Sequence, residues 1–212
     1  MAVFVKTPGF SPIKSRLALQ IGAAAARRCY ALSLLAVRRA VNSAARDGQV
    51  QAYWAVAEAS ATDHWRGWPT VPQFGDDLGA RMRFVYRALR KRHRGVLLLG
   101  GDVPTLTADD LQAAANALGT VPQRVIARAL DGGFGLFGAN VELANALWSS
   151  VQYGAPDTAT QFLERIAPEV PLVELPLVRD LDTCADLIAL GEDRRLPDAV
   201  RRRLAQAAHE FA

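Results

Sequence analysis

Short apolar runs and longer amphipathic segments alternate along the chain. The apolar runs predict strands, which fall at residues 2–6, 50–57, 95–100, 124–130 and about 170–178. Segments whose apolar residues recur every three or four positions predict helices, at residues 22–46, 77–93, 107–118, 141–150, 157–167, 183–191 and 197–211. Strands that alternate with helices predict an α/β fold, in which a parallel sheet is covered by helices on both faces.

Two local patterns strengthen this interpretation. The stretch "GVLLLGGD", residues 95–102, is apolar without alternation, which is typical of a central strand buried on both faces. Thr107 precedes a helical pattern and Asp110 follows three residues later. This spacing predicts a capping box, with Asp in place of the usual Glu, and so predicts where the helix begins.

Length and composition favour one domain covering residues 1–212. Half of the 212 residues are apolar, which suffices for a single well-buried α/β domain, and neither a linker nor a repeat is apparent. The N-terminus lacks the pattern of a signal peptide, and the apolar stretches are far shorter than the roughly 20 residues of a membrane helix. We therefore expect a cytoplasmic protein without a membrane span.

The net charge of +4 raises the possibility of nucleic-acid binding. The arginines concentrate at residues 81–94 and 194–203, and in the first cluster the apolar residues recur at helical spacing between them. These arginines are expected mainly on the solvent face of a helix, and few aromatic residues accompany them. We therefore expect no nucleic-acid partner. The two cysteines have no zinc-binding spacing.

The loop after the first strand is the first candidate binding site, because ligands of such sheets bind beyond the carboxyl ends of the strands. It carries Lys6, Lys14 and Arg16, which could converge on a diphosphate. Ile13 stands where a Walker A loop needs its second glycine, so that motif is excluded. Residue type alone is equally compatible with a solvated basic loop that binds nothing.

Three aspartates follow predicted strands or precede predicted helices. Asp102 ends the most apolar strand, so its carboxylate requires a cation, either a metal or a lysine. Asp182 could contribute to a metal site or, with Thr183, cap the helix at 183–191. Asp131, before two glycines, could face a substrate or simply form a tight turn.

Five motifs in order carry a family resemblance: "FVKTPGFSPIKSRLA", "QFGDDLGARM", "LLLGGDVPTL", "DGGFGLFG" and "DLDTCADL". From about residue 3 to residue 190 the chain resembles GT-A-fold, glycosyltransferase-like transferases of the radical-SAM/selenodomain-associated type. These are related to 2-phospholactate guanylyltransferases and molybdenum-cofactor nucleotidyltransferases. The resemblance implies a nucleotide-diphospho-sugar transferase fold, a mostly parallel twisted sheet with one reversed strand, and a nucleotide bound with Mg²⁺ or Mn²⁺.

The resemblance also implies roles for individual residues. It implies metal binding by Asp102 and Asp182 and catalytic roles for Asp102, Lys14 and Asp131. The residues that it implies in nucleotide binding are Lys6, Pro8, Ser11, Lys14, Arg16, Gln73, Gly75, Asp77 and Gly79. Ser11 replaces the usual glycine of the family, and Phe134 replaces its commoner tyrosine.

Asp102 and Asp182 are further expected to approach each other at one metal position. The apolar run before Asp182 could form a strand beside the one that ends at Asp102, so that both carboxylates would emerge at the same sheet edge.

The function expected from these residues and the resemblance is a metal-dependent transferase that uses a nucleotide-linked donor. Glycosyl transfer from an NDP-sugar is favoured, with nucleotidyl transfer from an NTP and release of pyrophosphate as the alternative. A nucleotide-binding protein without turnover is the third possibility. The expected partners are the donor and a small-molecule acceptor. The sequence leaves open the base, the sugar, the acceptor and whether the protein forms a homo-oligomer.

Overall fold

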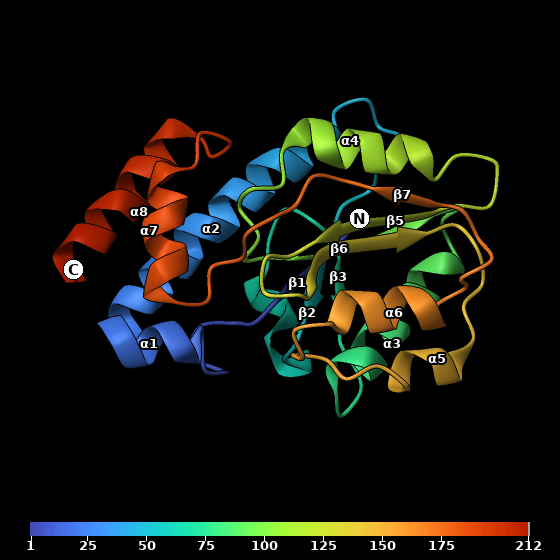
Figure 1. The fold of residues 1–212 in the computed structure, drawn as a ribbon, viewed down its shortest axis with the longest axis horizontal. Helices are drawn as coiled ribbons and strands as arrows, with labels where there is room; N and C mark the ends of the chain where they lie inside the picture. The colour runs from blue at the N-terminus through green and yellow to red at the C-terminus, as the bar shows by residue number, and fades with distance from the viewer. Residues whose placement is uncertain (212) are drawn as a thin grey trace.

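A seven-stranded sheet forms the centre of the computed structural model, which describes residues 1–211 (Figure 1). The strand order is β3-β2-β1-β4-β6-β5-β7. The strands are β1 (Ala2–Val5), β2 (Tyr53–Val56), β3 (Thr70–Pro72), β4 (Val96–Gly100), β5 (Arg124–Arg128), β6 (Phe134–Ala139) and β7 (Leu172–Glu174).

One strand runs against the others. β6 is antiparallel to both of its neighbours, β4 and β5, whereas every other pairing in the sheet is parallel. The start of β6 therefore lies at the same edge as the carboxyl ends of the remaining strands. This arrangement confirms the mostly parallel sheet with one reversed strand that the family resemblance implies.

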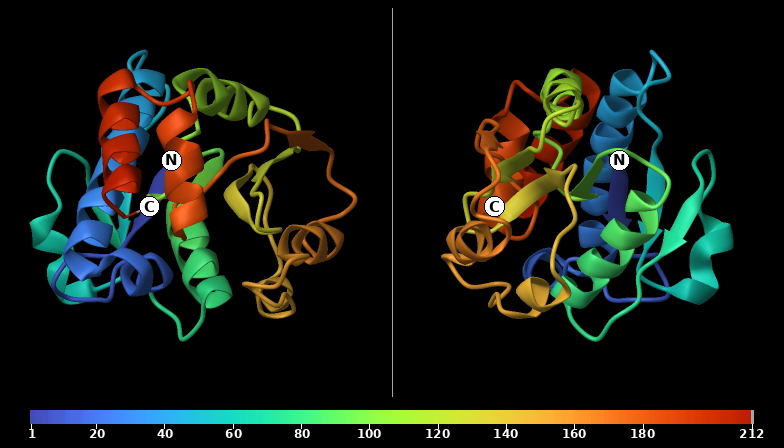
Figure 2. Two further views of the ribbon diagram at one scale, coloured as in Figure 1. Left: turned by 60° about the vertical axis from the view of Figure 1, so that its left-hand side comes forward. Right: turned by 90° about the vertical axis from the view of Figure 1, so that its right-hand side faces the viewer.

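Helices cover both faces of the sheet (Figures 1 and 2). Helices α2 (Ala23–Ala44) and α4 (Ala108–Ala117) pack on one face, and α3 (Leu78–Arg90), α5 (Asn145–Ser149) and α6 (Thr158–Arg165) pack on the other. Helices α1 (Ser15–Ile21), α7 (Cys184–Glu192) and α8 (Asp198–Phe211) pack with α2 beyond the edge of the sheet. A 3₁₀ helix, η1, spans Ala59–His64. None of these helices is long and apolar enough to cross a membrane.

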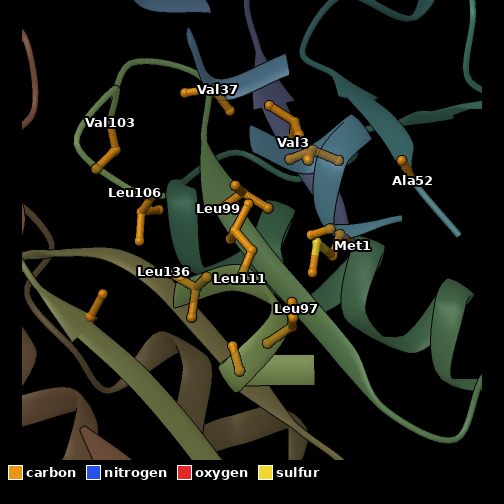
Figure 3. Packing of buried hydrophobic residues seen from close by; sticks show 14 of the residues in the cluster. Met1, Val3, Val37, Ala52, Leu97, Leu99, Val103, Leu106, Leu111 and Leu136 are labelled. Carbon is orange, nitrogen blue, oxygen red and sulfur yellow. The ribbon is translucent and has the colours of Figure 1, made fainter. Parts of the chain in front are cut away.

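The buried residues of β4 explain its uninterrupted apolar sequence. Leu97 and Leu99 belong to the cluster under α2 and α4 (Figure 3), whereas Val96 and Leu98 belong to the cluster under α3, α5 and α6. Successive side chains of a strand point to opposite faces, so a strand with helices on both sides needs an apolar residue at every position. Burial of β4 on both faces in turn fixes the position of Asp102, which follows it.

The sequence pattern located most elements and missed three. It missed α1 and η1, and it missed β3, which has only three residues and ends in Pro72. The alternation of Phe134 and Leu136 with glycines indicates that the glycine-rich stretch at 133–138 lies partly within a strand, and β6 confirms this. The capping box was predicted correctly: Thr107 Oγ1 accepts a hydrogen bond from Asp110 N at 3.1 Å.

The aromatic contact between β6 and α6 provides a test of this packing. The Phe162 side chain is fully buried, and its ring lies 4.7 Å from that of Phe137. Phe162→Ala should lower the free energy of unfolding by about 3–5 kcal/mol, because it removes buried area and leaves a cavity. Phe211→Ala is the matched control, since that ring is 43 % exposed and should change stability little. Urea unfolding of both variants checks the difference, and equal losses would contradict this core assignment.

Candidate functional site

A pocket of about 470 Å³ lies at the sheet edge where the parallel strands end. Its walls come from the segments after β1, β3, β4 and β5 and from the start of β6. The charged and amide side chains that line it are Lys6, Lys14, Gln73, Arg81, Asp102, Asp131, Asp180 and Asp182. The sheet order therefore brings together residues that are far apart in the chain. The first and the last of them, Lys6 and Asp182, are 176 positions apart.

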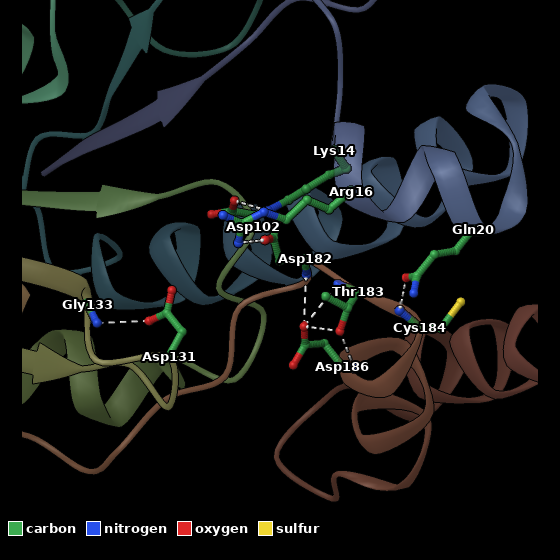
Figure 4. Close-up of polar contacts among 10 residues, drawn as sticks. All are labelled: Lys14, Arg16, Gln20, Asp102, Asp131, Gly133, Asp182, Thr183, Cys184 and Asp186. Atoms are coloured by element: carbon green, nitrogen blue, oxygen red, sulfur yellow. Dashed lines mark hydrogen bonds and ion pairs between the residues drawn. The ribbon is translucent and has the colours of Figure 1, made fainter. Parts of the chain in front are cut away.

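Lys14 lies between two of these carboxylates (Figure 4). Its Nζ is 2.6 Å from Asp102 Oδ2 and 3.4 Å from Asp182 Oδ1, and its side chain is only 10 % exposed. The backbone of Lys14 is left-handed, with φ 47° and ψ 58°, just before α1 begins. This conformation is unfavourable for a non-glycine residue and persists only where the surroundings enforce it.

The chain brings Asp182 to Asp102 by a different route from the one expected. β7 pairs with β5, and β6 and β5 separate it from β4, so the expected neighbouring strand does not form. Instead, the segment after β7 crosses the sheet edge, where Leu181 N donates to Asp102 O at 3.0 Å and Arg179 N donates to Thr105 Oγ1 at 3.1 Å. These bonds attach the residues before α7 to the loop after β4.

Asp182 does not cap the helix that follows it. Thr183 is the N-cap of α7, and it forms a capping box with Asp186. The Asp182 carboxylate instead accepts hydrogen bonds from Lys14 Nζ through Oδ1 and, at 2.9 Å, from Arg16 Nη1 through Oδ2. Asp182 is therefore held at the pocket by two cations, one buried and one exposed.

The pKa values of Lys14 and of the neighbouring Asp180 are both raised, but for different reasons. Burial lowers the pKa of Lys14, but Asp102 and Asp182 outweigh burial and raise this pKa above its ordinary value. Burial and the nearby Asp102 raise the pKa of Asp180 to about 6. The pocket thus stabilises the charge on its central lysine and penalises a further negative charge beside Asp102.

The basic loop after β1 is more ordered than a solvated loop. Thr7 N donates to Glu58 Oε2 at 2.8 Å, Thr7 Oγ1 accepts from Trp65 Nε1 at 2.9 Å, and Ser11 N donates to Thr7 O at 3.3 Å. The Ser11 amide that could have donated to a phosphate is therefore used within the loop. Pro8, Ser11 and Arg16 are not among the residues that line the pocket.

The segment after β3 lies at the same edge as Lys14, but only part of it reaches the pocket. Gln73 lines it, with its Nε2 donating to Ala55 O at 2.8 Å. Asp77 caps α3 by accepting from Ala80 N at 2.7 Å. Gly75 and Gly79 allow close packing, because a Cβ atom at Gly79 would lie 2.4 Å from the carbonyl oxygen of Trp148.

Asp131 stabilises a turn with one carboxylate oxygen and faces the pocket with the other. It lines the pocket, and its Oδ1 accepts a hydrogen bond from Gly133 N at 2.9 Å (Figure 4). The turn requires a glycine at position 132, where φ is 88° and a Cβ atom would lie 1.7 Å from Pro156 O. Asp131 is therefore a turn residue whose second carboxylate oxygen, Oδ2, is available to a ligand.

Sequence reasoning missed three pocket residues. Tyr30 lies within α2, where it resembles a core residue, yet its hydroxyl accepts from Lys6 N at 3.4 Å. Arg81 belongs to an arginine-rich helix that we assigned to solvent. Asp180 was noted only as part of a motif. The sequence offered one signal for a pocket residue among these three: Arg81 lies two residues after the Gln73–Gly79 segment, which the resemblance assigns to nucleotide binding.

The carboxylates fit a hard divalent ion that is held partly by its substrate. Within residues 1–211 no group of three or more His, Cys, Asp or Glu side chains forms a complete metal site. Mg²⁺, however, usually binds through one or two carboxylates together with substrate phosphates and water. Asp102 Oδ1 has no hydrogen-bond partner in the described chain, whereas both Asp182 oxygens contact cations. Asp102 is therefore the more accessible ligand.

A family model described as "Uncharacterized protein conserved in bacteria (DUF2064)" matches residues 30–155, more than half of the chain. The chain belongs to the DUF2064 family. The matched region contains Asp102 and Asp131, whereas Lys14 and Asp182 lie outside it. No curated protein matches this DUF2064 chain.

Solved structures confirm the fold of the DUF2064 chain. A Desulfovibrio desulfuricans G20 protein, provisionally named a nucleotide-diphospho-sugar transferase, has a TM-score of 0.81 and 21 % identity, and the match covers 99 % of this chain and 96 % of that one. Rv0371c from Mycobacterium tuberculosis H37Rv follows with a TM-score of 0.51 and 15 % identity, covering 91 % and 97 %. At these identities the similarity shows the nucleotide-diphospho-sugar transferase fold and not the reaction.

The ion pair of Lys14 can be tested by a double-mutant cycle. Lys14→Met should lower the free energy of unfolding by about 2 kcal/mol, because it leaves Asp102 and Asp182 close together without their shared cation. In the Asp102→Asn background the same change should cost at least about 1 kcal/mol less. Met has nearly the bulk of Lys and would keep the same left-handed backbone at position 14. The cycle therefore measures the contribution of the Lys14 charge. Urea unfolding at pH 7 measures all four proteins.

Arg16→Met is the control for this cycle. The Arg16 side chain is 72 % exposed, so its pair with Asp182 should contribute about 0.5 kcal/mol or less. An equal loss in the Lys14 and Arg16 variants, with no coupling to Asp102, would show that the buried pair does not stabilise the fold.

Proposed function

We propose that this protein is a transferase that acts on a nucleotide-linked donor, with glycosyl transfer from an NDP-sugar as its reaction. The observation that carries the proposal is the pocket along the strand ends, with Gln73 after β3 toward one side and Asp131 after β5 toward the other. Lys6, Lys14 and Asp102 lie between these sides, since they follow β1 and β4, which stand between β3 and β5 in the sheet. A donor made of a base, a diphosphate and a sugar has the same linear order.

The Gln73 side suits the nucleoside. The Gln73 amide nitrogen is occupied by the backbone carbonyl of Ala55, so the amide oxygen is the atom that can accept a hydrogen bond from a base. Apolar residues, among them Val5, Leu98 and Met82, also line the pocket. A partly apolar surface with a directed acceptor suits a nucleobase.

The middle of the pocket suits the diphosphate. Asp102 and Asp182 would hold Mg²⁺ or Mn²⁺, which would supply positive charge to the leaving diphosphate. The buried ammonium of Lys14 provides a second, fixed positive charge at the same place. Charges that are already oriented stabilise a developing anion without further reorganisation.

Asp131 would act on the acceptor. In glycosyl transfer the bond between the anomeric carbon and the diphosphate oxygen breaks, the acceptor oxygen bonds to that carbon, and the acceptor proton must leave. Asp131 is exposed to the pocket through Oδ2 while Oδ1 is fixed by Gly133 N. It is therefore positioned to receive this proton, as a general base requires.

A product analysis tests the reaction. Incubation with NDP-sugars and Mg²⁺ or Mn²⁺ should release NDP, and Asp131→Asn should slow this release by about 100-fold or more, the usual contribution of a general base. Release of pyrophosphate from NTPs would assign nucleotidyl transfer instead. Nucleotide binding without either product would identify a binding protein, and binding of neither class of nucleotide would refute the proposal.

Thermal unfolding tests the metal role separately from turnover. Mg²⁺ or Mn²⁺ should raise the melting temperature when nucleotide is present, since the ion would bind between the phosphates and Asp102. Asp102→Asn should abolish this increment, measured relative to its own metal-free melting temperature. Asp109→Asn, on the exposed side of α4, should retain the full increment. An increment that survives in Asp102→Asn would remove Asp102 from the metal site.

A further inference from the structure

The charges of the pocket are unevenly distributed. Its acidic side chains, Asp102, Asp131, Asp180 and Asp182, follow β4 and β5 or precede α7. Apart from Lys14, its cations lie on the other side, with Lys6 directly after β1 and Arg81 in the first turn of α3. An anionic ligand group is repelled by the acidic side and attracted by the basic one.

The two groups of cations also differ in their partners. Lys14 and Arg16 already form ion pairs with Asp102 and Asp182. Within residues 1–211, in contrast, neither Lys6 nor Arg81 forms an ion pair with a carboxylate. Their charges are therefore not neutralised by the protein, and a ligand can use them without first breaking a salt bridge.

Arg81 is also held in position for such a ligand. Its Nε donates to Gly75 O at 3.0 Å, which fixes one edge of the guanidinium and leaves both terminal NH₂ groups as donors. Gly75 lies two residues after Gln73, and Gln73 Nε2 lies 3.5 Å from the carbonyl oxygen of Val5, the residue before Lys6. The Gln73–Gly75 segment therefore contacts the residue before Lys6 through Gln73 and Arg81 through Gly75.

We infer that Lys6 and Arg81 form the primary binding site for a phosphate group of the donor. The inference rests on the proposed function for the identity of the ligand, but it assigns the anion contact to an arginine outside the candidate binding residues. Lys14, which is already paired with Asp102 and Asp182, then adds a further positive charge beside this site. A planar guanidinium with two free NH₂ groups can bind two oxygens of one phosphate, which a lysine cannot.

Calorimetric titration of the full chain with inorganic pyrophosphate and with nucleoside diphosphates, in the absence of metal, tests this site. Arg81→Gln should weaken binding of both probes by about 10- to 100-fold, the usual effect of losing a charge-assisted contact. Arg81→Lys should recover part of the loss, and Lys6→Gln should also weaken binding. Arg83→Gln is the matched control, because Arg83 is on the same helix but does not line the pocket.

The outcomes separate this inference from the proposed function. If the parent binds nucleoside diphosphates and Arg81→Gln binds them equally well, the inference is wrong and the proposed function stands. If pyrophosphate binds through Arg81 but no nucleotide binds, the anion site is supported and the proposed function fails. Binding of neither probe by the parent refutes both. A melting temperature of Arg81→Gln close to that of Arg83→Gln shows that the loss is not unfolding.

Discussion

The contact of Lys14 with Asp102 and Asp182 connects three parts of the chain that are distant in sequence. Lys14 ends the loop after β1, Asp102 follows the central strand, and Asp182 precedes α7. Two carboxylates at one position repel each other, and burial increases this repulsion because solvent no longer screens it. The lysine removes the repulsion, and its left-handed backbone is the local cost of placing an ammonium there.

This ion pair also explains how the helices beyond the sheet are attached. α1 begins directly after Lys14 and α7 begins two residues after Asp182, so the pair aligns the starts of both helices. Leu17 of α1 and Leu187 of α7 are then fully buried in one cluster with α2 and α8. The polar contact sets the relative position, and burial of apolar side chains supplies most of the stabilisation.

The sequence predicted the fold well where periodicity reports burial. The apolar run at β4 and the amphipathic helices were found because each faces the core in a regular pattern. Strand order is not a local property, so the position of β7 beside β5 could not be read from its residues. The glycines of β6 are explained only by the packing between strands: a Cβ atom at Gly138 would lie 2.3 Å from Leu97 Cδ2.

The candidate site was predictable in its location and only partly in its contacts. Asp102 was singled out because a carboxylate at the end of a buried strand needs a cation, and the residue type allowed either a metal or a lysine. The structure supplies a lysine, and Asp102 still retains one free oxygen. A bound metal would therefore have to share Asp102 with Lys14, whereas at Asp182 it would have to displace Lys14 or Arg16 from an oxygen. Adding a divalent cation beside Lys14 and Arg16 is favourable only when the phosphates of a nucleotide add negative charge to the pocket. The binding of nucleotide and the binding of metal are therefore expected to depend on each other.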